Sequence, residues 1–154
     1  MIKIIFVSTL LFASIASQSA FSQNAEDIIK YRTNIMKALG NHISIIAANL
    51  KGKVSINEDI LPHSKAMLLT LSSINIDKIF PENTAPNGSL KTQALSNIWT
   101  EKNIFEKSML NSIDKAKNLI LAAESGNKQS MAKSLGALGK TCGACHDKFR
   151  KKKN

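Results

Sequence analysis

The chain has 154 residues, which is enough for one domain with its own hydrophobic core. Lysine and arginine outnumber aspartate and glutamate by 21 to 11, for a formal net charge of +10, while aromatic residues make up only 5% of the chain. Such a basic surface suits an acidic partner, but the few aromatic residues and the lack of a nucleic-acid-binding motif argue against nucleic acid.

The first 22 residues have the pattern of a cleaved secretory signal peptide. Lys3 provides a positive start, residues 4–15 are mostly apolar, and Ala20-Phe21-Ser22 fits a small-x-small cleavage site. The apolar run is too short for a transmembrane helix, which needs about 20 residues. We therefore predict export to the periplasm, no transmembrane segment, and a mature domain over residues 23–154.

The mature chain shows four amphipathic helical patterns and no strand pattern. The first covers residues 25–50, with Asn24 as its N-cap, and the second covers residues 57 to about 74. An irregular stretch follows at residues 75–90, Thr100 is a candidate cap for the third helix, and the fourth begins after Asn127. Four helices with two short connections and one long one predict an all-α, antiparallel four-helix bundle.

The fourth helical pattern contains Cys142-Gly143-Ala144-Cys145-His146. Cys-x-x-Cys-His is the attachment signature of c-type haem. Each thiol can form a thioether to the porphyrin edge, and the histidine can bind the iron from one side. Both cysteines share a helical stripe with apolar residues, as a buried planar cofactor requires. The stripe consists of Met131, Leu135, Leu138, Cys142, Cys145 and Phe149.

Three glycines interrupt the same helical pattern, at positions 136, 139 and 143. Each costs roughly 1 kcal/mol relative to alanine inside a helix. We interpret them as positions where the porphyrin or a neighbouring helix approaches the bare backbone.

Three other uses of the cysteine pair fit less well. A thioredoxin-type dithiol requires the pair at a helix N-terminus after a strand, where the thiolate is stabilised. A zinc site needs about four ligands, whereas the other histidines, His42 and His63, stand alone far upstream and read as ordinary helix residues. A disulfide between residues three apart on one helix closes a very tight loop with poor geometry. We therefore predict one covalently attached haem c per chain.

Several separated segments resemble the class II c-type cytochromes, the cytochrome c-prime family. They are Tyr31-Arg32 on the first helix, a segment with Thr92, Ala94, Leu95, Ile98 and Trp99, then Phe105, and finally Cys142 to Arg150. The resemblance covers nearly the whole mature chain. Ser96 is a departure, because the family usually has proline there.

The resemblance implies roles for several residues upstream of the haem motif. The family position four after the first-helix arginine is usually leucine or phenylalanine, which leaves the iron five-coordinate, but a low-spin branch has methionine there. Since this chain has Met36, we expect the low-spin branch, with His146 and Met36 as the axial ligands. Arg32 is expected to meet a haem propionate, and Thr92 and Trp99 are expected near the haem edge.

Saturated coordination favours electron transfer, because the iron changes charge with little rearrangement. We therefore predict an exported cytochrome that carries single electrons, meets an acidic redox partner and is not an enzyme. The alternative is a five-coordinate haem protein that binds nitric oxide or carbon monoxide. A third class, an apo thiol or metal-binding module, fails if denatured protein retains haem. The resemblance also suggests a homodimer packed through the first two helices.

Overall fold

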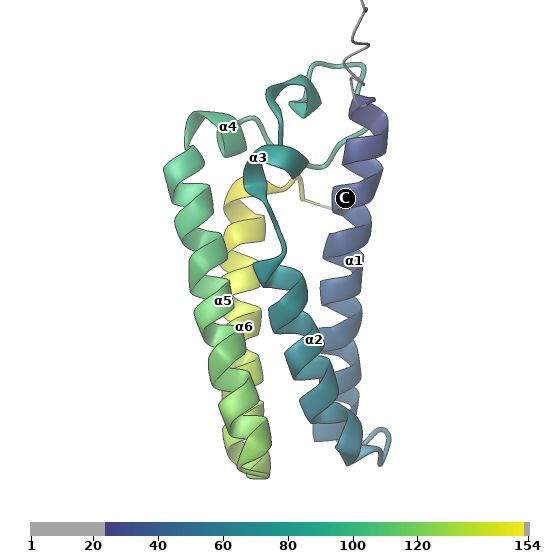
Figure 1. The fold of residues 1–154 in the computed structure, drawn as a ribbon, viewed down its shortest axis with the longest axis vertical. Coiled ribbons are helices and arrows are strands. Elements are labelled where there is room, and N and C mark those ends of the chain that lie inside the picture. The colour runs from purple at the N-terminus through teal and green to yellow at the C-terminus, as the bar shows by residue number, and fades with distance from the viewer. Residues whose placement is uncertain (1–23, 153–154) are drawn as a thin grey trace, which may run out of the picture.

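The computed structural model describes residues 24–152, and four long antiparallel helices form a bundle (Figure 1). The predicted all-α four-helix bundle is therefore confirmed. Within the described residues no strand occurs, and Ala94 and Arg150 form an isolated antiparallel bridge. The long helices are α1 (Ala25–Leu50), α2 (Ile60–Ser72), α5 (Lys102–Glu124) and α6 (Lys128–Phe149); the short elements are η1 (Asn57–Asp59), α3 (Ile76–Ile79), η2 (Glu82–Thr84) and α4 (Asn97–Thr100).

The ends of α1 and α6 follow the capping residues seen in the sequence. The Asn24 side chain accepts a hydrogen bond from the backbone N–H of Glu26 at 3.1 Å, and the Asn127 side chain accepts one from Ser130 at 2.9 Å. Gly52 and Gly126 stop α1 and α5 at φ values of 68° and 69°, a backbone conformation that glycine adopts without steric cost.

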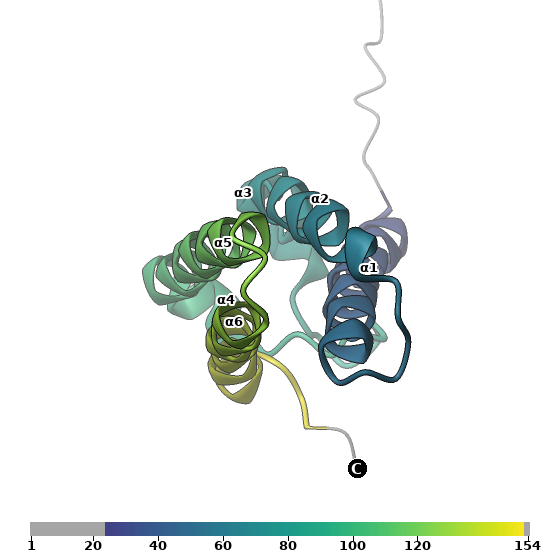
Figure 2. The same cartoon turned by 90° about the horizontal axis from the view of Figure 1, so that it is seen from below.

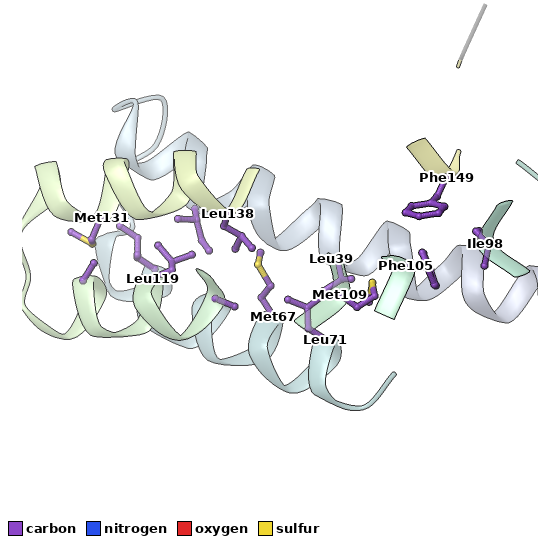
Figure 3. Packing of buried hydrophobic residues seen from close by; sticks show 14 residues of the cluster. Leu39, Met67, Leu71, Ile98, Phe105, Met109, Leu119, Met131, Leu138 and Phe149 are labelled. Carbon is purple, nitrogen blue, oxygen red and sulfur yellow. The ribbon is translucent and has the colours of Figure 1, made fainter. Parts of the chain in front are cut away.

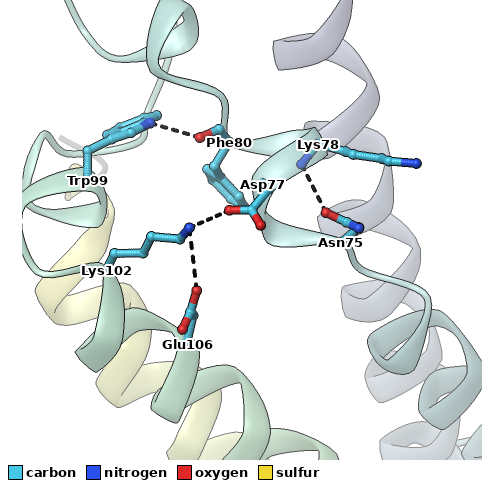
Figure 4. A network of polar contacts seen from close by, with 7 residues as sticks. All are labelled: Asn75, Asp77, Lys78, Phe80, Trp99, Lys102 and Glu106. Atoms are coloured by element: carbon cyan, nitrogen blue, oxygen red, sulfur yellow. Dashed lines mark hydrogen bonds and ion pairs between the residues drawn. The ribbon is translucent and has the colours of Figure 1, made fainter.

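The connection between α2 and α5 contains more structure than the sequence predicted. Asn75 caps the short helix α3 by accepting from the backbone N–H of Lys78 at 3.1 Å, and Lys102 of α5 pairs with both Asp77 of α3 and Glu106 (Figure 4). The prediction that Thr100 caps the third helix is wrong. Thr100 is the last residue of α4, and α5 begins at Lys102 after Glu101.

The core lies along the axis of the bundle (Figure 3), and each long helix contributes at least one large apolar side chain that is almost fully buried. Four such side chains are at most 1% exposed: Ile46, Met67, Leu119 and Leu138. On α5 the side chain of Leu119 is fully buried, whereas that of its neighbour Ile120 is only partly buried.

The four long helices do not pack equally against their neighbours. α5 packs extensively on both α6 and α2, and α1 packs on α2, but α1 and α6 contact one another much less (Figure 2). No helix within residues 24–152 is long and apolar enough to cross a membrane. The predicted signal peptide, residues 1–22, lies outside the described residues.

Leu119→Ala should lower the free energy of unfolding by about 2–5 kcal/mol, since it opens a cavity among buried side chains. Leu121→Ala is the matched control on the same helix, because Leu121 is 64% exposed. It should stay within about 0.5 kcal/mol of the native protein. Denaturant titration of the holoprotein measures both changes, and equal losses would contradict this packing.

Candidate functional site

Helix α6 carries all three residues of the haem-attachment motif. Cys142 and Cys145 are half-buried, lie one turn apart and pack against the hydrophobic core, and neither forms a disulfide. His146 is half-buried on the adjoining part of the helix. Two free thiols on one face, followed directly by an imidazole, provide the donor set that haem c requires.

Burial holds these three side chains in their uncharged forms. It raises the pKa of Cys142, and burial together with Cys142 raises the pKa of Cys145 to about 11. Because a redox-active dithiol needs a lowered thiol pKa, the thioredoxin-type alternative does not fit. Burial and then the charge of Arg150 lower the pKa of His146, and Asp147 opposes this in part. The neutral imidazole is the form that binds a metal.

Two observations concern the side of α6 that carries the motif. A Cβ added at Gly139 or at Gly143 would meet no heavy atom within 4 Å beyond the chain neighbours and the backbone of α6. No neighbouring helix therefore explains these glycines. α1 also packs loosely on α6. The residues present fit covalently attached haem on the side of α6 that carries Cys142 and Cys145.

Arg32 of α1 is a buried cation held by neutral acceptors. Only 4% of the residue is exposed, and burial lowers its pKa to about 10. Its Nη1 donates to Thr84 Oγ1 at 2.6 Å and to the Ile79 carbonyl at 3.3 Å, and its Nη2 donates to Thr92 Oγ1 at 2.7 Å and to the Thr84 carbonyl at 3.2 Å. No carboxylate within residues 24–152 forms an ion pair with it.

An aromatic series extends from Arg32 toward α6. The guanidinium carbon lies 4.9 Å from the ring centroid of Phe80 and 5.9 Å from that of Trp99. Phe80 meets Phe105 edge-to-face at 5.0 Å, and Phe105 meets Phe149 in the same way at 5.1 Å. Trp99 Nε1 donates to the Phe80 carbonyl at 2.8 Å (Figure 4), which fixes the tryptophan at this end of the bundle.

The segment after Thr92 joins the Arg32 cluster to the end of α6. Thr92 Oγ1 accepts from the backbone N–H of Ala94 at 3.1 Å, and Ala94 forms the bridge with Arg150. In that bridge the N–H of Leu95 donates to the Phe149 carbonyl at 3.0 Å. The structure thus brings Arg32, Thr92 and Trp99 together and ties them to the helix that carries Cys142, Cys145 and His146.

Comparison with known proteins decides which family this arrangement represents. The family model described as Cytochrome C′ matches residues 27–150. This chain belongs to the cytochrome c′ family. Cytochrome c′ of Pararhodospirillum photometricum is 36% identical over 125 residues, which cover 81% of this chain and 97% of that protein. As a member of the family, the protein carries covalently attached haem c, in agreement with the prediction.

Solved cytochromes c′ share the fold at low sequence identity. One, described by its ligand-controlled dimer dissociation, has a TM-score of 0.76 at 21% identity and covers 84% of this chain and 98% of its own. A second is the nitric oxide complex of a mutant cytochrome c′ from Alcaligenes xylosoxidans, with a TM-score of 0.73, 23% identity, and the same coverage of 84% and 98%.

The predicted six-coordinate His/Met electron carrier is wrong. The family match and the 36% identical relative belong to the cytochromes c′, in which the iron is five-coordinate. Met36 is partly buried and packs against the hydrophobic core, which accounts for its place on the inner face of α1. Methionine commonly fills irregular core space without binding a metal. The low-spin branch, with Met36 and His146 as axial ligands, therefore has no support.

Sequence reasoning missed the partners of Arg32. Thr84 is fully buried and holds two of the four guanidinium bonds, and Phe80 stacks under the charge. Both residues lie in the irregular connection, where no helical period marks an inward face. The one available signal was Arg32 itself, on the inner face of a predicted helix, because a buried guanidinium requires hydrogen-bond acceptors from elsewhere in the chain.

Arg32→Lys should destabilise the holoprotein by about 1–3 kcal/mol, because an ammonium group cannot satisfy Thr84 and Thr92 at the same time. Denaturant titration measures the loss. Lys30→Arg, an exchange at an exposed position of the same helix, is the control and should have little effect. Non-additive losses in a double-mutant cycle with Thr84→Val would confirm the Arg32–Thr84 contact, whereas simple addition would contradict it.

Proposed function

We propose that the protein binds nitric oxide or carbon monoxide at a five-coordinate haem c, and that it is a binding protein and not an enzyme. The observation that carries the proposal is membership of the cytochrome c′ family together with the packing of Met36 into the core. The nitric oxide complex of a structural relative points to the same class of ligand. When bound, haem would supply an iron that can take a diatomic ligand.

Different residues of this chain would hold different parts of the haem. Cys142 and Cys145 would attach it to α6, and His146, kept neutral by burial, would bind its iron. Arg32 supplies a buried positive charge with no carboxylate partner within residues 24–152, so a haem propionate is a fitting counter-ion. Thr92, held by Arg32 at 2.7 Å, and Trp99 would then lie on the propionate side.

The ferric holoprotein should have a high-spin spectrum, and the reduced protein should bind carbon monoxide and nitric oxide with a change of its visible spectrum. Met36→Leu should leave the ferric spectrum unchanged, because the side chain fills space and does not bind iron. Optical titration with each gas provides the measurement.

Met67→Leu is the matched control, since it makes the same exchange at a core position that is 1% exposed. A low-spin ferric spectrum whose methionine–iron charge-transfer band disappears only in Met36→Leu would refute five-coordination. Failure of both gases to bind a high-spin protein would refute the ligand-binding function by itself.

The remaining proposals concern where the protein works and with what. Its relatives and the predicted signal peptide support a periplasmic location. Arg150, Lys151 and Lys152 give the end of α6 an exposed basic surface, which supports an acidic partner protein. Lys148 is not free for such a partner, because its Nζ pairs with Glu101 at 2.5 Å.

We also propose a homodimer that buries the outer faces of α1 and α2. These faces expose apolar side chains, with Tyr31 61% exposed and Leu69 71% exposed. A structural relative with ligand-controlled dimer dissociation supports a dimer whose stability depends on the haem ligand.

Sedimentation of the holoprotein should show a dimer that Leu69→Glu dissociates. Leu121→Glu on α5, at a position that is 64% exposed, should leave the dimer intact. A native protein that is monomeric at every concentration, or equal effects of the two variants, would contradict this interface.

A further inference from the structure

Two histidines from different helices meet at the contact between α1 and α2. His42 Nδ1 lies 2.9 Å from His63 Nδ1, and the ring centroids are 5.1 Å apart. Both rings are half-buried. The residues one turn before and after each ring belong to the hydrophobic core and are at most 9% exposed: Leu39, Ile46, Ile60 and Met67. The pair thus lies at the edge of the core and not on an open surface.

The geometry of the pair is that of a hydrogen bond. The centroid separation exceeds the Nδ1···Nδ1 distance by 2.2 Å (5.1 − 2.9), close to twice the radius of an imidazole ring. The two nitrogens therefore face one another almost in line, which leaves no space for a metal ion between their lone pairs. No third histidine, cysteine or carboxylate joins them as a metal-binding group within the described residues. One ring must donate through Nδ1–H and the other must accept.

Such a bond responds differently to the first and second added protons. The first proton can bind Nε2 of the donor ring, whose Nδ1–H still donates, so the hydrogen bond persists and becomes charge-assisted. The second proton must bind the accepting Nδ1. Two N–H groups would then face one another between two positive rings, and the contact cannot be kept.

We propose that His42 and His63 form a pH-sensitive lock between α1 and α2, which holds with none or one extra proton and opens when both rings are protonated. The inference concerns the packing of two helices and does not depend on the ligand of the haem. It matters for the site because α1 also carries Arg32 and Met36, so release of α2 loosens the helix that faces the haem-bearing α6.

The surroundings of the pair do not neutralise the second charge. The pKa of His42 is lowered by burial and then by the charge of His63, and no other charged group contributes within the described chain. Among the charged residues of the packed elements, Lys37 on α1, Lys65 on α2, and Lys133 and Lys140 on α6 add positive charge. Glu124 on α5 pairs with Lys65 at 3.5 Å, and Asp59 in η1 does not contribute to the pKa shift of His42.

The sign of the pH dependence follows from the lowered pKa. A histidine has an ordinary pKa of 6.5, so below that value the unfolded chain binds more protons than the folded one. The contribution of the pair to stability is therefore complete above about pH 6.5 and is lost as the pH falls through the lowered pKa of His42.

The test is a pH titration of histidine-labelled holoprotein, in which NMR follows the ring nitrogens of both residues. We expect two macroscopic steps separated by more than about one pH unit, as strongly coupled sites show. The denaturant concentration at the unfolding midpoint should decrease as the pH is lowered through the second step. In the double variant His42→Asn with His63→Asn, this decrease should disappear.

His63→Asn alone is the matched control, because it removes the partner and leaves His42 in place. His42 should then titrate in a single step, at a higher pH than the second step of the native pair. Independent titration of both histidines in the native protein would overturn the proposal, and this result needs no variant to fold. If the unfolding midpoint of the double variant decreased with falling pH as much as that of the native protein, the pair would not be a lock.

Discussion

A buried positive charge organises the end of the bundle that faces the haem motif. Arg32 is 4% exposed, so its guanidinium must find acceptors inside the protein, and Ile79, Thr84 and Thr92 provide them. Those acceptors fix the course of the long connection between α2 and α5. The same connection then pairs with the end of α6 through Ala94 and Arg150, so one charge positions both the loop and the attachment helix.

The haem motif and the coordination state are separate questions. Cys142, Cys145 and His146 specify that haem is present, because thioether bonds and one axial ligand require only those residues on one helix. They say nothing of the opposite axial position, which depends on a residue more than a hundred positions away. The thioether sulfur of Met36 is able to bind iron, but the side chain also packs against the hydrophobic core. Family membership favours the core role.

The basic character of the chain acts at two ranges. The excess of positive charge over the chain would steer an acidic partner from a distance, which would speed association without specifying a contact. At short range individual cations have local partners, as Lys102 does with Asp77 and Lys148 with Glu101. The histidine pair adds charge only in acid, at a place where two helices must stay in contact.

The sequence by itself determined the four helices, most of their ends and the haem-attachment residues, because these depend on local periodicity, caps and a short motif. Asn24, Gly52 and Asn127 mark helix ends through bonds or dihedral angles within a few residues. Only the tertiary structure decided which residues surround Arg32, that Leu119 points inward and that His42 meets His63. Those contacts join residues 21 to 60 positions apart, and no local pattern specifies which side chains meet across the bundle.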